Sequence, residues 1–379
     1  MKLKRILKHI VKWTSLAITL VLVLGVIALF IAYWRSTNDC GRRTAAQGDQ
    51  MKAIVYCDFG PPDVLKLEDI NRPVPNDDQV LIKVRAASVN PYDWHFMRGI
   101  PYVMRMEAGL RKPKVTRLGG DVAGQVEAVG KNVTRFKAGD EVFGLCNGAF
   151  ADYCLGRSKL AMKPASMTFE QAAAVPVAAV TALQGLRDKG KIETGQRVLI
   201  NGASGGVGTF AVQIAKSLGA NVTGVCSGRN VEMVRSLGAD QVIDYTKEDF
   251  TQGAQRYDLI LDCVGTQPLS GFKRVLKRDG VCVLIGGGGP DEGNWIGPLA
   301  RPLKALVIAP FISQKIGMMV AEVNKEDLTL LADLMQAGKM TPVIDRTYTL
   351  SEVPEAIRYL EKGHARGKVI IRTGSPGSR

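Results

Sequence analysis

The sequence lacks several patterns that characterise common classes of protein. Its 379 residues contain no internal repeat and no low-complexity tract. There are no blocks of Lys and Arg interleaved with aromatic residues, so we expect no nucleic-acid partner. The net charge is nevertheless +14. Residues 1–50 hold eight Lys and Arg against two Asp, and the remaining excess of +8 is diffuse, which suits an anionic small molecule or a membrane surface.

CxxC pairs are also absent, although the chain has seven cysteines. Several of these cysteines lie inside apolar, strand-like stretches. The simplest interpretation is that all seven are free, buried thiols in a reducing compartment.

A long uncharged stretch near the N-terminus is the first strong positive feature. Residues 13–34 contain no charge, and 22 residues of helix would span roughly 33 Å, enough to cross the hydrocarbon core of a bilayer. Trp13 lies at one end, and Tyr33 and Trp34 lie at the other, as at membrane interfaces. A cleaved signal peptide is the alternative, but its apolar region is normally shorter, and no clear small-x-small site follows. We therefore predict an uncleaved, single-pass membrane anchor.

The rest of the chain divides into regions of different pattern. Residues 35–50 form a polar linker, and "MKAIVY" at residue 51 begins a strand. Residues 51–175 contain short strands and turns, which indicates a β-rich domain. From 176 to 310, strands alternate with helices, which predicts a parallel sheet covered on both faces. The predicted strands of this second domain are 197–200, 221–226, 241–245, 257–263 and 281–285.

A glycine-rich turn, "NGASGGVGTFAVQIAK" (201–216), lies between one of these strands and a helix. Glycines at 205, 206 and 208 permit a tight turn and let a pyrophosphate reach backbone N–H groups at the helix N-terminus. A purely structural turn is the alternative. The preceding strand and following helix favour a dinucleotide site.

The end of the next strand indicates which dinucleotide binds. A site for NAD usually has Asp or Glu about 20 residues beyond the glycines, for the ribose 2′-hydroxyl. Here "VTGVCSGRN" (222–230) contains no carboxylate, and Ser227 and Arg229 suit a 2′-phosphate instead. Arg229 as a merely solvated residue is the alternative. We expect NADPH, with NADH as a second candidate.

These features resemble the medium-chain dehydrogenase/reductase superfamily, in its zinc-independent quinone oxidoreductase branch. The resemblance covers almost all of 51–373. The matching stretches are "SVNPYDWHFMRG" (88–99), "GGDVAGQVEAVGKNVTRFKAGDEVFG" (119–144), "AAAVPVAAVTALQGL" (172–186), "NGASGGVGTFAVQIAKSLGA" (201–220), "LGADQVIDY" (237–245), "YDLILDCVG" (257–265) and "GHARGKVII" (363–371).

The resemblance implies an α/β fold with two domains behind the anchor and linker at 1–50. A GroES-like β domain would comprise 51–175 with 311–373, and a Rossmann doubly wound parallel sheet would comprise 176–310. The cofactor would lie in the cleft between them and a homodimer is implied. The cofactor-binding positions carried over are Thr181, Ala203, Ser204, Gly205, Gly206, Val207, Gly208, Ser227, Arg229, Tyr245, Gly286, Arg366 and Lys368.

The zinc ligands of related enzymes are missing. Relatives with zinc have a Cys soon after the position of Asn90 and the triplet "GHE" where this chain has Gly119-Gly120-Asp121. Cys146 and Cys154 lack further partners, so we predict no metal site. The remaining candidates for orienting the substrate are Asn90, Tyr92, Asp93 and His95. His95 is a proton donor in one reading and a structural or cleft-lining residue in the other.

Without a Lewis acid, reduction is the easier direction. We therefore expect NADPH-dependent hydride transfer to a quinone or to the β-carbon of an enone, and the anchor suits substrates that partition into a bilayer. Two alternatives are a non-catalytic NADPH-binding membrane sensor or scaffold and a zinc-type alcohol dehydrogenase. The charge bias around the anchor favours the catalytic part outside the cytoplasm. The need for NADPH and reduced thiols favours the cytoplasmic side, which we predict.

Overall fold

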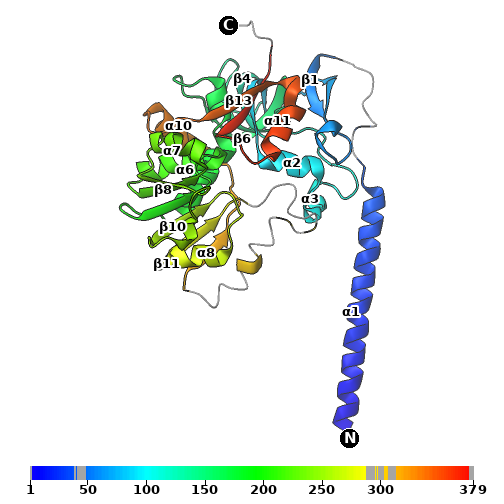
Figure 1. Ribbon diagram of the computed structural model, residues 1–379. Helices are drawn as coiled ribbons and strands as arrows, with labels where there is room; N and C mark the ends of the chain where they lie inside the picture. Colours follow the sequence, from blue (N-terminus) through cyan, green and yellow to red (C-terminus); the bar gives the residue numbers. More distant parts are fainter. Residues whose placement is uncertain are drawn as a thin grey trace.

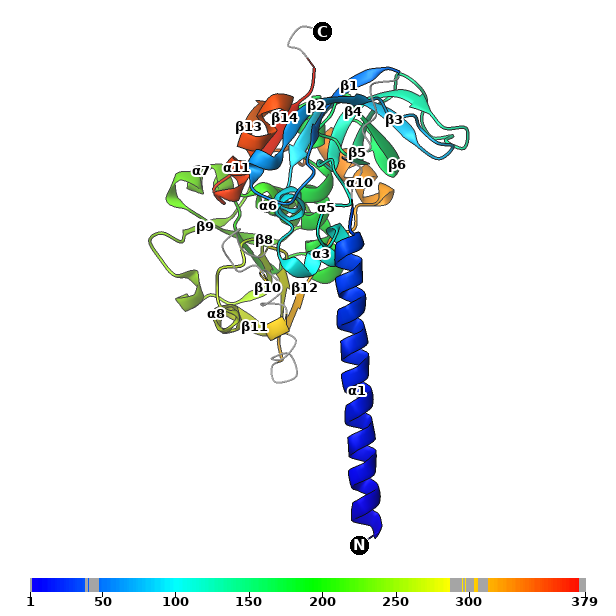
Figure 2. The same cartoon turned by 90° about the vertical axis from the view of Figure 1, so that its right-hand side faces the viewer.

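The computed structural model describes residues 2–37, 40, 48–286, 295, 297, 303–305 and 313–374. Two lobes form a body, and one long helix, α1 (Lys2–Arg35), extends away from it (Figures 1 and 2). Most of the apolar and basic segment 294–320 lies outside the described residues. The strand order of each lobe explains how distant motifs meet.

The first lobe is built on antiparallel strands. β1 (Gln50–Val55) pairs with β2 (Lys66–Asn71), and a six-stranded sheet follows the order β13-β14-β3-β4-β5-β6. β3 also pairs with β6, so that β3, β4, β5 and β6 close on themselves, as expected for the GroES-like domain. The strands of this sheet are β3 (Val80–Val89), β4 (Asp121–Val129), β5 (Glu141–Asn147), β6 (Tyr153–Met162), β13 (Ile344–Thr349) and β14 (Lys368–Arg372).

The second lobe is a parallel sheet of Rossmann type, in the order β12-β11-β10-β7-β8-β9. The five strands that we expected from the alternation of strands and helices in the sequence are all present. The interiors of the central strands β7, β8 and β10 are almost entirely buried, as parallel sheets covered on both faces require. The strands are β7 (Arg197–Asn201), β8 (Asn221–Cys226), β9 (Gln241–Asp244), β10 (Tyr257–Asp262), β11 (Leu276–Leu284) and β12 (Lys315–Met318).

Helices cover these sheets and connect the lobes. They are α2 (Pro91–Arg98), α3 (Arg105–Ala108), α4 (Phe169–Ala173), α5 (Pro176–Gln184), α6 (Gly206–Ser217), α7 (Val231–Ser236), α8 (Leu269–Val275), α10 (Lys325–Gln336) and α11 (Val353–Glu361). Single turns are η2 (Pro62–Val64), η3 (Tyr102–Met104), η5 (Gly228–Asn230), η6 (Phe250–Gln252) and η9 (Leu350–Glu352), and η4 (Gly185–Lys189) is a π-turn that continues α5.

One predicted boundary differs from the structure. We assigned 311–373 to the GroES-like domain, but β12 pairs in parallel with β11 and is an edge strand of the Rossmann sheet. The chain then returns to the first lobe, where α10 packs against β6 and β13 and β14 join the antiparallel sheet. The error arose because β12 has only four residues, so its pattern is too short to recognise.

The prediction that all cysteines are free is wrong for four of them. Cys40 is bonded to Cys57, and Cys146 is bonded to Cys154. The second bond links β5 to β6, whereas the first ties the polar linker to the residues after β1. Cys226, Cys263 and Cys282 are thiols rather than half of a disulfide. CxxC spacing could not reveal these bonds, because strand pairing and the path of the linker bring the partners together.

The helix α1 contains the predicted anchor. Its segment Ala17–Arg35 is long and apolar enough to cross a membrane, with a mean hydropathy of 2.6 and no burial against the body. This criterion concerns length and composition only, and a signal sequence would also satisfy it.

Candidate cofactor site and active site

The glycine-rich turn joins β7 to α6, as its spacing predicts. Gly202 has a φ of +83°, and a Cβ on Gly208 would collide with the carbonyl oxygen of Gly202. Gly205 is the residue before the first turn of α6, and a Cβ there would meet only the Gly202 oxygen, at 3.4 Å. The turn is therefore open above Gly205, where the unpaired N–H groups of the helix N-terminus can bind a phosphate.

The segment before β14 lies against this turn. Gly205 forms a β-bridge with Gly367, and a Cβ on Gly206 would lie 3.2 Å from Cδ of Lys368. Gly367 has a φ of +99°, and a Cβ there would collide with Val343. Residues separated by more than 160 positions thus form the boundary between the two lobes.

Ser227 and Arg229 follow β8, near the same turn. The amide of the buried Asn230 donates hydrogen bonds of 3.1 Å to both Ser204 and Ser227, so it joins the glycine turn to the end of β8. Its Oδ1 is buried without a hydrogen-bond partner among the described residues. Arg229 is exposed and donates a hydrogen bond to the carbonyl oxygen of His364.

The sequence analysis did not identify Asn230 as a site residue, although Asn230 lies only three residues after Ser227. It also missed Asp244, which ends β9 beside Gly228. Hydrogen bonds from Thr246 are the main cause that holds the pKa of Asp244 below its usual value. A negative charge therefore lies close to the turn that follows β8, and the Lys247 ammonium 3.8 Å away partly offsets it. The neighbouring Tyr245 is exposed.

A buried polar network lies where β3, β4 and β14 meet. The Lys368 ammonium donates to Oδ1 of Asn90 at 2.6 Å and lies 3.7 Å from Oδ2 of Asp121. The same Asp121 oxygen accepts hydrogen bonds from Asn90 and from Ser88. All four residues are buried. Burial raises the pKa of Asp121 and lowers that of Lys368, while their attraction opposes both shifts.

Asp121 connects this network to the second lobe. Its other carboxylate oxygen accepts a hydrogen bond of 3.0 Å from the backbone N–H of Val177, in the first turn of α5. A carboxylate at this position also interacts favourably with the helix dipole. Thr181, a predicted cofactor contact, lies one turn further along α5 and bonds the Val177 carbonyl oxygen. Sequence reasoning missed the role of Asp121 because its partners come from three separate segments.

Asn90 and Asp93 hold the start of α2. The carboxylate of Asp93 accepts hydrogen bonds from the backbone N–H groups of Asn90 and Gly119, at 2.8 and 3.1 Å. Burial raises the pKa of Asp93 to about 7. The side chain is fully enclosed, so its role is to position α2 against the loop at Gly119.

Tyr92 points towards Gly120. A Cβ on Gly120 would collide with the Tyr92 hydroxyl, so the phenol lies where related zinc enzymes carry a histidine side chain. Burial raises the pKa of Tyr92 well above its ordinary value, and the nearby Asp93 and Asp121 carboxylates act in the same direction. At neutral pH the hydroxyl is therefore a neutral hydrogen-bond donor.

His95 lies elsewhere on α2. Its ring stacks on Trp94 with centroids 3.6 Å apart, and its Nδ1 lies 2.7 Å from the carbonyl oxygen of Ile100. Burial lowers the pKa of His95, so the ring is neutral at pH 7 and Nδ1 must carry the proton to donate to that carbonyl. Nε2 then has no proton to give, which favours the structural interpretation of this residue.

The carboxyl ends of β7 and β10 carry further buried polar contacts. The buried Asp262 accepts hydrogen bonds from Asn201 and from the backbone of Val264 and Gly265. Gly286 follows β11, and a Cβ there would collide with the backbone of Cys263. Only glycine fits, so Gly286 shapes the strand ends.

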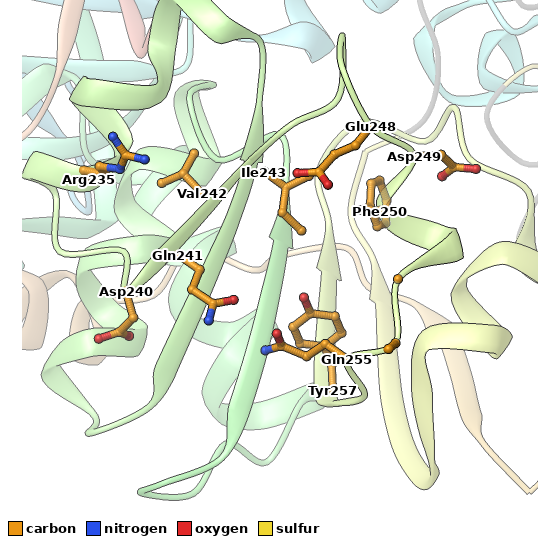
Figure 3. A pocket seen from close by; sticks show the side chains of 12 residues that line it. Arg235, Asp240, Gln241, Val242, Ile243, Glu248, Asp249, Phe250, Gln255 and Tyr257 are labelled. Carbon is orange, nitrogen blue, oxygen red and sulfur yellow. The ribbon is translucent and has the colours of Figure 1, made fainter.

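A separate surface pocket of about 570 Å³ lies at the β9 edge of the sheet (Figure 3). It includes Gln241 and Tyr257, which begin β9 and β10, and none of the predicted site residues. Ligands of open α/β sheets bind beyond the carboxyl ends of the strands. This pocket is therefore not the dinucleotide site. Among the residues that the structure describes, no group of three or more His, Cys, Asp or Glu side chains could hold a metal ion.

Comparison with known proteins agrees with this arrangement. Residues 76–184 match the alcohol dehydrogenase GroES-like domain, and residues 237–371 match the family described as zinc-binding dehydrogenase. The chain is 36% identical over 339 residues to 2-methylene-furan-3-one reductase of Solanum lycopersicum, covering 85% of this chain and 79% of that protein.

Two further matches extend over nearly the full length of the related protein. The chloroplast envelope quinone oxidoreductase homolog of Arabidopsis thaliana is 33% identical, covering 86% of this chain and 99% of that protein. The structure of a quinone oxidoreductase from Coxiella burnetii superposes with a TM-score of 0.76 at 32% identity, covering 86% of this chain and 99% of that one.

The fold and site thus define an oxidoreductase that uses a nicotinamide cofactor. The chain belongs to the medium-chain dehydrogenase/reductase superfamily and has quinone oxidoreductase-like relatives.

Proposed function

We propose that this protein reduces a quinone or an α,β-unsaturated carbonyl compound with NADPH and without zinc. The names of its relatives support both substrate classes. The observation that carries the proposal is the Tyr92 hydroxyl, a neutral donor held against Gly120, beside the buried Lys368 network. A single hydrogen-bond donor suits a carbonyl oxygen that gains negative charge during reduction.

The residues around the glycine turn fit a dinucleotide. The open turn at Gly205 and the N–H groups of α6 would bind the pyrophosphate, together with Ala203, Gly206, Val207 and Gly208. Ser204, Ser227, Arg229 and the unpaired oxygen of Asn230 would bind the adenosine end. Thr181, Tyr245, Gly286, Arg366 and Lys368 remain proposed contacts along the cleft. The bound dinucleotide would supply a hydride.

The side chains of α2 would act on the other reactant. Tyr92 would donate a hydrogen bond to the substrate oxygen, because its raised pKa keeps the proton on the hydroxyl. Asn90 and Asp93 would hold α2 in place, and Asp121 would keep Lys368 charged at the lobe boundary. His95 would fix the end of α2 rather than donate a proton.

Zinc independence rests on how Gly120 is surrounded. A ligating side chain at this position would collide with Tyr92, and Cys146 and Cys154 are joined to each other. A zinc-type alcohol dehydrogenase would need space for a ligating side chain at position 120 and cysteines that are not bonded to each other.

We propose that α1 is a single-pass anchor, supported by its exposed apolar surface and its flanking Trp and Tyr residues. Cofactor supply favours the catalytic part on the cytoplasmic side. The excess of basic residues in α1 before its apolar segment favours the opposite side, as do two disulfides, which persist in oxidising compartments. A reporter fused to the C-terminus should be active when that reporter works only in the cytoplasm. Activity of a reporter that works only outside the cytoplasm would reverse this assignment.

A homodimer remains a prediction from the resemblance.

The experiment that tests the function is NADPH oxidation by purified protein with a panel of quinones and enones. Turnover with either class supports the reductase. NADPH binding without turnover of any substrate would favour the alternative, a sensor or scaffold on the same fold.

A further inference from the structure

The segment from Tyr102 to Arg117 follows α2 in the chain and lies beside the C-terminal end of α1. Both ribbon views place α3, which belongs to this segment, close to that end of the helix (Figures 1 and 2). The segment contributes to neither the glycine turn nor the buried network. Its surface exposes apolar and basic side chains together.

The contact with α1 is direct. The hydroxyl of Ser36, one residue after the helix ends, lies 3.3 and 3.4 Å from the backbone N–H groups of Arg111 and Lys112. The guanidinium of Arg111 lies 5.4 Å from the centre of the Trp34 ring. The segment 102–117 therefore contacts the end of the apolar helix directly, although a polar linker lies between that helix and β1 in the sequence.

Apolar side chains project from the same segment into solvent. Val103 is 45% exposed, Met106 is 67% exposed and Val115 is 52% exposed. Tyr102 packs edge-on against Trp295, which is itself 76% exposed. Isolated exposed apolar residues are ordinary, but several within one short segment mark an interaction surface.

The charges of the segment agree with a lipid surface. Five basic residues stand against the single acid Glu107; they are Arg105, Arg111, Lys112, Lys114 and Arg117. Lys112 pairs with Asp58 at 3.3 Å, so a positive excess remains after that pair. Basic residues next to a membrane span are attracted to anionic lipid headgroups.

We propose that Tyr102–Arg117 is a second membrane contact, in which Val103, Met106 and Val115 enter the interface of a bilayer and the basic residues bind anionic headgroups. The occupant is a lipid bilayer, because the surface continues from the end of the apolar helix and combines exposed apolar groups with positive charge. This contact would place α2, which carries Tyr92, near the membrane surface. That consequence for substrate access rests on the proposed enzyme activity, whereas the docking itself rests only on the proposed anchor.

The test uses full-length protein in lipid nanodiscs that contain a phospholipid with a photoreactive group near the glycerol backbone. Labelled peptides are then identified by mass spectrometry, with phosphatidylcholine alone or mixed with phosphatidylglycerol. We expect labelling of 102–117 and of the end of α1, with stronger labelling of 102–117 in the anionic discs and weaker labelling at high salt. Peptides that contain Val74 and Val320, which are 84% and 80% exposed, should stay unlabelled.

Matched variants make the assignment specific. The double variant Val103→Asp/Met106→Asp should reduce labelling of 102–117 roughly tenfold, which corresponds to about 1.4 kcal/mol of lost interaction. Val74→Asp and Val320→Asp should leave it unchanged. Turnover of a water-soluble quinone by the double variant serves as the control for folding.

The outcomes separate this proposal from the anchor and from the enzyme activity. Labelling of α1 without 102–117 would overturn the second contact and leave the anchor in place. Labelling of 102–117 without α1 would support the contact and reject the anchor. Equal labelling at Val74 and Val320 would overturn the proposal. So would concentration-dependent protection of 102–117 in detergent, because that result would identify an interface between two copies of the chain.

Discussion

The ammonium group of Lys368 donates a 2.6 Å hydrogen bond to Oδ1 of Asn90, which links the first residue of β14 to the residue that precedes α2. The same Lys368 side chain lies against Gly206 in the glycine turn. The pair therefore joins the cofactor cradle to the helix that carries Tyr92. Asp121 supports both members from β4.

The first prediction concerns this buried charge pair. Replacing either Asp121 by Asn or Lys368 by Met leaves the opposite charge buried, and should lower the free energy of unfolding by about 3–5 kcal/mol. The double variant Asp121→Asn/Lys368→Met should lose less than the sum of the single variants. Urea unfolding of all four proteins measures this coupling. Strictly additive losses would show that the two groups do not interact.

The second prediction is a pH effect from Asp93. Its pKa of about 7 in the folded protein lies above the ordinary 3.8, so the folded state binds a proton that the unfolded chain releases. This contribution to stability is fully present below about pH 4 and is lost as the pH rises towards 7, at no more than about 1.4 kcal/mol per pH unit. Thermal unfolding between pH 5 and 8 should show this slope in the wild type and a shallower one in Asp93→Asn. Parallel curves would contradict the prediction.

The third prediction concerns the choice of cofactor. If Arg229 reads the 2′-phosphate, NADPH should bind more tightly than NADH, and Arg229→Ala should narrow the gap by roughly 1–3 kcal/mol. Titration of both dinucleotides gives the four affinities needed. Arg235→Ala is a suitable control, because Arg235 lies on α7 and pairs with Glu232. Equal affinities of the unmutated protein for NADH and NADPH would remove the basis for this assignment.

The fourth prediction separates Tyr92 from His95. Tyr92→Phe removes only the hydroxyl and should lower kcat by roughly 10²-fold, within the range for a transition-state hydrogen-bond donor or acid. His95→Gln should change kcat much less, because its proton is committed to Ile100. Steady-state kinetics with one quinone and one enone would show the difference. The reverse order of effects would make His95 the donor.

Sequence patterns predicted most of the fold because the signals are local. The strands of the Rossmann sheet are short apolar stretches bounded by turns, and the glycine turn lies between β7 and α6 where its spacing requires. The resemblance also supplied Lys368 and Asn90 as separate positions. It could not show that the two side chains are bonded, because strand pairing over 278 positions creates that contact.

The missed features share this long-range origin. Asp121 gains its role from partners on β3, β14 and α5, and Asn230 gains its role by bridging two loops. The two disulfides depend on strand register and on the path of the linker. Exposed residues such as Met106 carry no local signal of function at all. Only their position beside α1 makes them informative.

The central claim is that this protein reduces quinones or enones with NADPH and needs no metal. The most direct test is NADPH oxidation by the purified full-length protein, measured before and after treatment with a chelator, with elemental analysis of the same sample. Unchanged turnover and the absence of stoichiometric zinc are the predicted result. Loss of activity that returns with added zinc, together with one tightly bound zinc per chain, would contradict the account.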